Sequence, residues 1–207
     1  MSGSWNRNFY TLLTAALLCD DNISSSAQPT DYTPPLRVHL PTGSWQAVGF
    51  RNGGANNPTG ITSILTPGKY DITLGTTYNP TISSYGVSIC FGSGTTPASY
   101  EDYRIETPIS TGLSLGSASG SRTKPTTYDS DNQTISSTRT FTFTNSSSSS
   151  INVNEMAIYA KWDYGALDCC CIYREVFDET IVLAPGESLL VDFNRDGAIY
   201  NYTPYPA

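Results

Sequence analysis

The segment Arg139-Thr140-Phe141-Thr142-Phe143-Thr144 alternates between aromatic and hydroxyl side chains at every second residue. This period is typical of a β-strand that buries one face and exposes the other. Comparable short runs recur along the chain and are separated by turn residues such as Thr66-Pro67-Gly68 and Ala184-Pro185-Gly186. The pattern predicts an all-β protein, an antiparallel β-sandwich of jelly-roll type, and it argues against a helical bundle.

Nine segments carry this strand pattern. They are Leu36–Leu40, Trp45–Phe50, Tyr70–Leu74, Gly86–Phe91, Thr138–Asn145, Asn154–Trp162, Cys169–Glu175, Thr180–Leu183 and Ser188–Phe193. The serine run 146–150 lies between two of them and is interpreted as a hairpin loop. We therefore expect a β-sandwich domain over residues 36–207, ending in a Tyr- and Pro-rich tail. An N-terminal helix and an extended arm are expected over residues 1–35.

The N-terminal segment has the spacing of a short amphipathic helix. Its apolar residues recur at three- and four-residue steps, and Ser4 stands where a capping residue is expected. The residues on this apolar side are Trp5, Phe9, Leu12, Leu13 and Leu17. The helix either covers one end of the β domain or docks into a neighbouring subunit, and the assembly interpretation makes these five residues subunit contacts. The apolar run is too short to span a bilayer. Cleavage before Cys19, as in a lipoprotein, is not favoured because bulky Leu18 precedes it.

The cysteines do not form a disulfide pattern. There are five, and three of them are consecutive, Cys169-Cys170-Cys171. In a strand, Cys169 and Cys171 would face one side and Cys170 the other. The cysteines are expected to be small buried side chains of a protein that folds in a reducing compartment.

Few residues suggest catalysis, a cofactor or nucleic-acid binding. The chain has 207 residues and a formal net charge of −7, which disfavours a phosphate-binding surface. His39 is the single histidine and lies in a strand pattern, and the nearby carboxylates Glu101, Asp102 and Glu106 have no partner across a cleft. The sequence therefore predicts no enzyme and no cofactor.

Two sites remain open at the C-terminal end. Asp192, Asn194 and Asp196 alternate before Gly197, as in the first half of a calcium loop, but the twelfth position is Thr203. A turn at Asp196-Gly197, joining Ser188–Phe193 to Ala198–Tyr202, is the preferred interpretation. Tyr200, Tyr202 and Tyr205 in the tail form a possible binding surface.

One resemblance spans residues 86–193. The segments Val87-Ser88-Ile89-Cys90-Phe91-Gly92-Ser93-Gly94-Thr95, Val153-Asn154-Glu155-Met156-Ala157-Ile158-Tyr159 and Ile181-Val182-Leu183-Ala184-Pro185-Gly186 follow one another in this order. They resemble a β module of structural proteins in tailed-bacteriophage virions. The resemblance implies a packing role for Glu155 and Tyr159. It also implies assembly with copies of itself and with other capsid, neck or tail proteins, in a virion built in the host bacterial cytoplasm. A receptor- or glycan-binding module is the alternative.

Overall fold

The computed structural model describes residues 2–17, 37–47, 72–82, 87–116, 127–129, 134–161 and 169–198. Within these residues the chain forms one helix and eleven strands. In order they are β1 (Ser2–Trp5), α1 (Arg7–Leu17), β2 (Arg37–His39), β3 (Trp45–Ala47), β4 (Ile72–Gly75), β5 (Val87–Gly92), β6 (Leu113–Leu115), β7 (Thr127–Asp129), β8 (Thr134–Asn145), β9 (Ile151–Lys161), β10 (Cys169–Leu183) and β11 (Ser188–Ala198).

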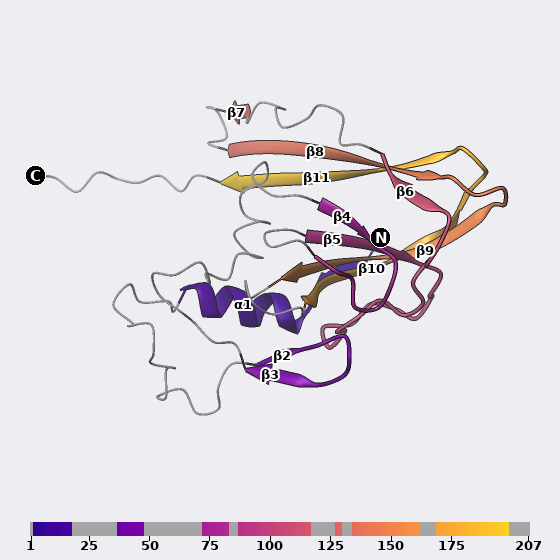
Figure 1. The fold of residues 1–207 in the computed structure, drawn as a ribbon. Coiled ribbons are helices and arrows are strands. Elements are labelled where there is room, and N and C mark those ends of the chain that lie inside the picture. The colour runs from indigo at the N-terminus through magenta and orange to yellow at the C-terminus, as the bar shows by residue number, and fades with distance from the viewer. Residues whose placement is uncertain are drawn as a thin grey trace, which may run out of the picture.

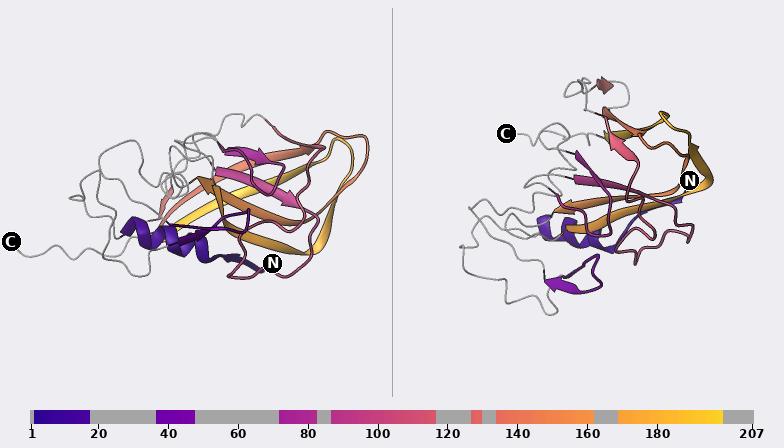
Figure 2. Two further views of the ribbon diagram at one scale, coloured as in Figure 1. Left: turned by 60° about the horizontal axis from the view of Figure 1, so that its bottom comes forward. Right: turned by 45° about the vertical axis from the view of Figure 1, so that its right-hand side comes forward.

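The strands form two larger sheets and a small hairpin (Figure 1). The first sheet has the order β1-β10-β9-β5-β4, and the second has the order β11-β8-β6 with β7 also paired to β8. Strands β2 and β3 pair only with each other among the described strands, and they lie on the far side of α1 from the sheets (Figure 1). Further views show the same stacking of the two larger sheets (Figure 2). The predicted all-β, sandwich-like fold with one N-terminal helix is confirmed. One pair departs from it, because β4 and β5 run parallel.

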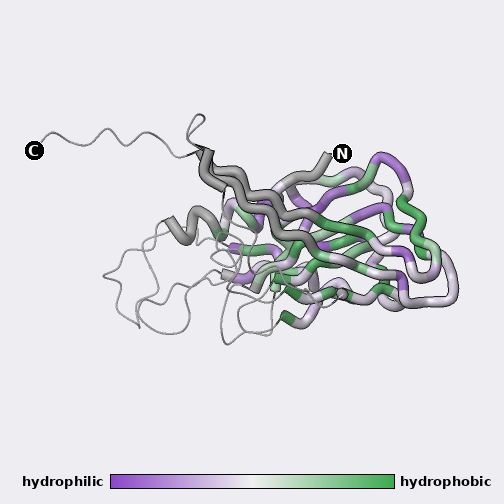
Figure 3. The backbone as a smooth tube through the Cα atoms, turned by 90° about the horizontal axis from the view of Figure 1, so that it is seen from above, coloured by the Kyte–Doolittle hydropathy of each residue, from purple (hydrophilic) through white to green (hydrophobic). Residues whose placement is uncertain are grey.

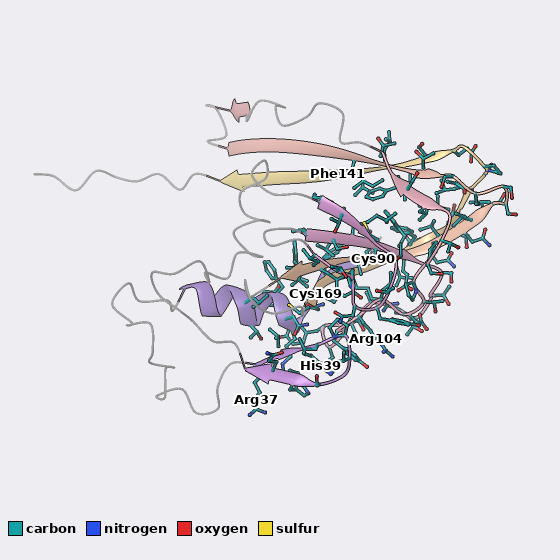
Figure 4. The ribbon with its side chains drawn as sticks, in the orientation of Figure 1. Arg37, His39, Cys90, Arg104, Phe141 and Cys169 are labelled. Carbon is teal, nitrogen blue, oxygen red and sulfur yellow. The ribbon has the colours of Figure 1, made fainter. Side chains whose placement is uncertain are left out.

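An apolar core joins the two larger sheets. Phe141 and Phe143 of β8 are buried and pack with Ile89 and Phe91 of β5 and with Val153 of β9. The predicted alternation of β8 is confirmed, since both phenylalanines face this core (Figure 4 labels Phe141). Hydrophobic and hydrophilic stretches likewise alternate along the described strands (Figure 3). The serine run joins β8 of one sheet to β9 of the other, so it is not a hairpin loop.

Strand β10 replaces two predicted strands. Val176 pairs with Glu155 and Ile181 pairs with Val153, so residues 177–180 of β10 lie opposite the single residue Asn154 of β9. Such a bulge bends a strand without ending it. The bulge contains the acidic pair Asp178-Glu179, and polar residues of this kind are typical of turns. The prediction of a break between Glu175 and Thr180 is therefore wrong.

Strand β11 also runs through a predicted turn. Asp192, Asn194, Asp196 and Gly197 all belong to one strand whose register with β8 is unbroken from Ser188 to Ala198. Extended residues at alternate positions lie about 6–7 Å apart along a strand, so their backbone does not curl around an ion. Both the turn at Asp196-Gly197 and the calcium loop are contradicted by this backbone, while the side chains of residues 192–198 lie outside the described part.

The N-terminus is built into the first sheet. Strand β1 pairs antiparallel with residues 173–176 of β10, and α1 packs against β10 and β2. The helix is capped by Asn6, whose Oδ1 accepts a hydrogen bond from the Phe9 backbone N–H at 3.3 Å. Ser4, the predicted cap, lies within β1.

Two buried asparagines hold α1 in place. The Asn6 side chain donates to the Cys171 carbonyl at 3.0 Å. The Asn8 side chain donates to the carbonyls of Cys171 at 2.9 Å and His39 at 2.8 Å, and it accepts from the His39 N–H at 2.7 Å. Leu12 is fully buried against β2 and β10. The helix therefore covers its own β domain, as the first of the two interpretations predicts.

Four cysteines of the described residues are buried as thiols. Cys170 packs in the cluster beneath α1, whereas Cys169, Cys171 and Cys90 pack together in a different cluster. The predicted division of the cysteine triplet between the two faces of a strand is confirmed. Burial raises the pKa of the Cys90 thiol to about 12 and raises the pKa of Cys170 and Cys171 well above the usual value.

These four thiols are expected to resist alkylation in the folded protein. The thiolate is the reactive form, and burial suppresses it as well as access to it. In a Cys19→Ser variant, iodoacetamide should label none of the four within the time that labels all four in urea. Mass spectrometry of intact protein gives the count. Labelling of one or more thiols at the unfolded rate under native conditions would contradict the packing described here.

Candidate interaction surface

The loop of residues 93–109 is held to the first sheet by one buried carboxylate. Glu155 of β9 is completely buried. Its oxygens accept hydrogen bonds from the backbone N–H groups of Gly94 at 3.0 Å, Glu106 at 3.1 Å and Thr107 at 2.8 Å. Because β9 is a central strand, this side chain fixes both ends of the loop on a rigid support.

Arg174 completes the buried network. Its guanidinium is 3% exposed and donates to Glu155 at 2.8 Å, to Asp102 at 3.0 Å and to the Thr96 carbonyl at 3.0 Å. Glu106 lies 3.4 Å away on the outer side. Burial acts against the charged guanidinium, but the hydrogen bonds to Asp102 and Glu155 outweigh it and raise the pKa of Arg174. The charge of Glu155 is therefore compensated within the fold.

Tyr159 anchors the middle of the same loop. Its hydroxyl accepts a hydrogen bond from the Ile105 N–H at 2.8 Å, and both side chains are buried. Burial raises the pKa of Tyr159 well above its usual value, so the phenol stays protonated. Glu155 and Tyr159, the two residues with an implied packing role, both bind the 93–109 loop.

The three loop carboxylates considered for sugar chemistry are engaged in ion pairs. Asp102 and Glu106 contact Arg174, while Glu101 pairs with Arg7 at 3.3 Å on the surface. Glu106 also accepts hydrogen bonds from the Thr96 hydroxyl at 2.7 Å and the Thr96 N–H at 2.9 Å. These bonds, with that of the hydroxyl the largest cause, lower the pKa of Glu106.

A Thr96→Val variant is expected to raise the pKa of Glu106 toward its ordinary value. The ionised carboxylate is the form that the hydroxyl stabilises, so its contribution to folding is present above the unfolded pKa and is lost as pH falls through the folded pKa. An NMR titration of the Glu106 carboxyl carbon measures the shift. Ser99→Ala, on the same loop but with no bond to Glu106, serves as the control. An unchanged Glu106 pKa in Thr96→Val would contradict the assigned cause.

The anchored loop contributes to a continuous row of stacked side chains. The His39 ring lies 4.3 Å from that of Trp45 and 3.9 Å from that of Tyr103. The guanidinium of Arg7 lies 4.9 Å from the Trp45 ring, and that of Arg104 lies 5.4 Å from Tyr103. Arg104 also lies 4.9 Å from Tyr78. We call this set the stacked row, and its members in order are Arg7, Trp45, His39, Tyr103, Arg104 and Tyr78.

A second aromatic group lies beside the stacked row. Trp5 stacks on Phe9 with ring centroids 4.2 Å apart, Phe9 contacts Tyr10, and Tyr10 lies 6.0 Å from Tyr100. The Arg7 N–H donates to the Tyr100 carbonyl at 2.8 Å, which ties the two groups together. We call the two groups together the aromatic–arginine surface.

This surface is where exposed aromatic side chains concentrate. Among the described residues, seven large hydrophobic side chains are exposed, and five of them belong to it: Trp5, Tyr10, Trp45, Tyr78 and Tyr100. The other two, Val182 and Leu190, lie on β10 and β11. His39, Arg104 and the neighbouring Arg37 lie on the side of the molecule away from β8 and β11 (Figure 4). The clustering marks this side as the candidate interaction surface.

The predicted assembly residues divide between surface and core. Trp5 is 37% exposed and belongs to the surface. Phe9 is half-buried beneath Trp5, and Leu12 is fully buried within its own chain. The assignment of Leu12 as a subunit contact is therefore wrong, because its surface is already covered. Leu13 and Leu17 belong to α1, but their side chains lie outside the described residues, as do Tyr200, Tyr202 and Tyr205.

The stacked row and the network beneath it are not predicted by the sequence patterns. Trp45 and His39 stand in strand patterns, and Tyr103 and Arg104 stand between the carboxylates Asp102 and Glu106. Their one available signal was the density of aromatic and arginine residues in Tyr100-Glu101-Asp102-Tyr103-Arg104.

Neither a metal centre nor a membrane span is found in the described part of the chain. There, no group of three or more His, Cys, Asp or Glu side chains is arranged to hold a metal ion. No helix among the same residues has the length and apolar character needed to cross a bilayer.

Comparisons with known proteins gave no match to this chain, whether with protein-family models, curated proteins or solved structures.

Proposed function

We propose that this chain is a non-enzymatic structural protein of a tailed-phage virion, a capsid decoration or cement protein or a neck or tail component. It acts by contacts between subunits, with copies of itself and with other virion proteins as partners. The observation that carries the proposal is the aromatic–arginine surface on a rigid, anchored loop.

The composition of this surface is that of a protein contact. Trp, Tyr and Arg are the residue types that contribute most to binding energy in protein interfaces, and Trp45, Tyr100 and Arg104 are of these types. Their rings are already stacked, and Glu155 and Arg174 fix the loop beneath them. Less side-chain entropy is then lost on association than for a flexible surface.

The charged groups of the site support a structural role over catalysis. The carboxylates of Asp102, Glu106 and Glu155 are bound to Arg174 or to backbone N–H groups. His39 is stacked between Trp45 and Tyr103. Each of these groups stabilises the fold or the loop, which is what a protein that acts by assembly requires.

The location in the virion follows from the resemblance of residues 86–193 to a phage structural module. The four buried thiols of the described residues are compatible with folding in the reducing cytoplasm of a host bacterium before incorporation into the particle.

Two measurements test this proposal. Size-exclusion chromatography with light scattering on the full chain should give a mass above that of the 22.4 kDa monomer. Mass spectrometry of phage particles purified from cells that produce the protein should find it in fixed proportion to other virion proteins. A strict monomer that is present in the lysate and missing from the particles would contradict the proposal.

Glycan binding is the second candidate, and the exposed rings of Tyr78 and Tyr100 favour it because sugars stack on aromatic rings. The ring of Trp45 already contacts His39 and Arg7, which leaves less of it for a sugar. Specific binding on a glycan array by a strictly monomeric protein would favour this second function.

A further inference from the structure

The charges on and beneath the aromatic–arginine surface balance one another. They are four guanidinium groups and four carboxylates, those of Arg7, Arg37, Arg104 and Arg174 and of Glu101, Asp102, Glu106 and Glu155. A charged partner therefore gains little net attraction at this surface, because the fields of close opposite charges cancel at a distance. The groups that remain to select a partner are the aromatic rings.

The most exposed of these rings lie side by side. Tyr10 and Tyr100 are 47% and 49% exposed, and their ring centroids are 6.0 Å apart with 37° between the ring planes. Flat, rigid groups such as aromatic and proline rings bury much apolar area at a small cost in side-chain entropy. The surface therefore suits an uncharged partner that is rich in tyrosine or proline.

The chain itself contains a segment of this composition, which we call the tail. It comprises residues 199–207, which follow β11 and lie outside the described residues. Its sequence is Ile199-Tyr200-Asn201-Tyr202-Thr203-Pro204-Tyr205-Pro206-Ala207. The tail has no charged side chain, whereas every other segment of more than four residues outside the described part has at least one. Its composition therefore matches the surface better than that of any of these segments.

Strand β11, from which the tail continues, lies on the other side of the molecule from the surface. It ends at Ala198, which pairs with Thr134 of β8. Arg37, His39 and Arg104 lie on the side away from β8 and β11 (Figure 4). The tail has nine residues, which span at most about 30 Å, and a path to its own surface must pass around both sheets. A second copy can place its surface directly beside the end of β11.

From this arrangement we infer that the tail of one copy binds the aromatic–arginine surface of a second copy. The inference deepens the proposed function and depends on it. Proline-containing segments dock on aromatic rings as a polyproline II helix, which has three residues per turn. That period places Tyr202 and Tyr205 on one edge of the bound tail, about 9 Å apart. Their rings stack on those of Tyr10 and Tyr100.

Such a contact is head-to-tail. The tail and the surface differ, so each copy that receives a tail still offers its own tail to another copy. Contacts of this kind close into rings or extend as filaments. Both are forms in which repeated subunits occur in a particle.

Two double substitutions in the full chain test the inference. The tail variant is Tyr202→Ala with Tyr205→Ala, and the surface variant is Tyr10→Ala with Tyr100→Ala. Each should weaken self-association at least about tenfold, because tyrosines in the centre of a contact contribute much of its binding energy. Light scattering over a range of concentrations measures the change.

Each variant has a matched control. Asn201→Ala with Thr203→Ala alters the same tail between its tyrosines. Leu190→Ala removes an exposed side chain on β11, away from the surface. Both controls should associate as the unaltered chain does, and circular dichroism with melting curves establishes that every variant is folded.

A mixture of the two variants gives the sharpest result. The tail variant keeps an intact surface and the surface variant keeps an intact tail, so one of each can form a single contact. The complex then has no second working tail and surface, and growth stops. Light scattering of the mixture should therefore give a mass about twice that of the 22.4 kDa monomer.

The possible failures are distinguishable. Self-association that persists in both variants would overturn the inference and leave the proposed function standing. Loss of association in the surface variant alone would also overturn it, because the surface would then bind another part of the second copy. Variants that weaken association and do not pair in the mixture would overturn it as well. A chain that is monomeric at all concentrations would remove the proposed function itself.

Discussion

Replacement of Arg174 by methionine is expected to lower the free energy of unfolding by about 3–5 kcal/mol, the usual cost of leaving one member of a buried ion pair unpaired. Glu155 would keep three backbone hydrogen bonds but would lose its compensating charge. Asp102 would lose its ion-pair partner and keep only the hydrogen bond from the Ser99 N–H. Urea denaturation followed by circular dichroism measures the change.

Two further variants distinguish the cost of leaving a buried charge unpaired from the cost of removing any arginine side chain. Arg7→Met breaks the ion pair between Arg7 and Glu101. Because these two side chains are 48% and 60% exposed, the substitution should lower the free energy of unfolding by less than about 1 kcal/mol. Adding Glu155→Gln to Arg174→Met removes the unpaired charge and should recover part of the lost stability. A loss near 1 kcal/mol for Arg174→Met itself would contradict the role given to the network.

A chain shortened to begin at Asp31 is expected not to fold to a stable monomer. It lacks β1, which covers residues 173–176 of β10, and it lacks α1 with Leu12 and the buried Asn6 and Asn8. The apolar side chains beneath the helix would be exposed to water, at a cost of about 25 cal/mol per Å². Circular dichroism and a melting curve measure the outcome.

A point substitution in α1 also tests the contribution of the N-terminal segment to stability, without a deletion. Leu12→Ala should cost about 2–5 kcal/mol because it leaves a cavity in a buried cluster. Tyr10→Ala, on the same helix but 47% exposed, should cost much less. A shortened chain that melts like the full one would show that the N-terminal segment is a detachable arm after all.

Much of the fold follows from local sequence signals. The Phe-Thr alternation of β8 survives because one face of that strand is buried against β5 and β9. The Ala184-Pro185-Gly186 turn forms because Gly186 takes a positive φ of 82°, which a side chain would disfavour. The division of the cysteine triplet follows from the two-residue period of a strand.

The errors occurred where tertiary contacts override those signals. Asp178-Glu179 resembles a turn, yet β9 pairs on both sides of the bulge and keeps β10 continuous. Asp196-Gly197 also resembles a turn, but β8 provides a partner along the whole of β11.

The aromatic–arginine surface could not be predicted from the sequence because it, too, depends on tertiary contacts. Its members come from β1, α1, β2, β3 and two loops, and the loop members meet the others because Glu155 and Arg174 hold the 93–109 loop beside the helix. No local pattern indicates that Glu155 and Arg174 are partners, since the strand register that brings them together depends on a bulge between Cys171 and Tyr173.

The most direct test of the central claim is hydroxyl-radical footprinting of the full chain at low and high protein concentration. The account predicts that oxidation of Trp45, Tyr78 and Tyr100 falls when the chain assembles, while that of exposed Leu190 on β11 stays the same. Assembly that leaves Trp45, Tyr78 and Tyr100 as reactive as in the dilute protein would contradict the claim that the aromatic–arginine surface forms the contact.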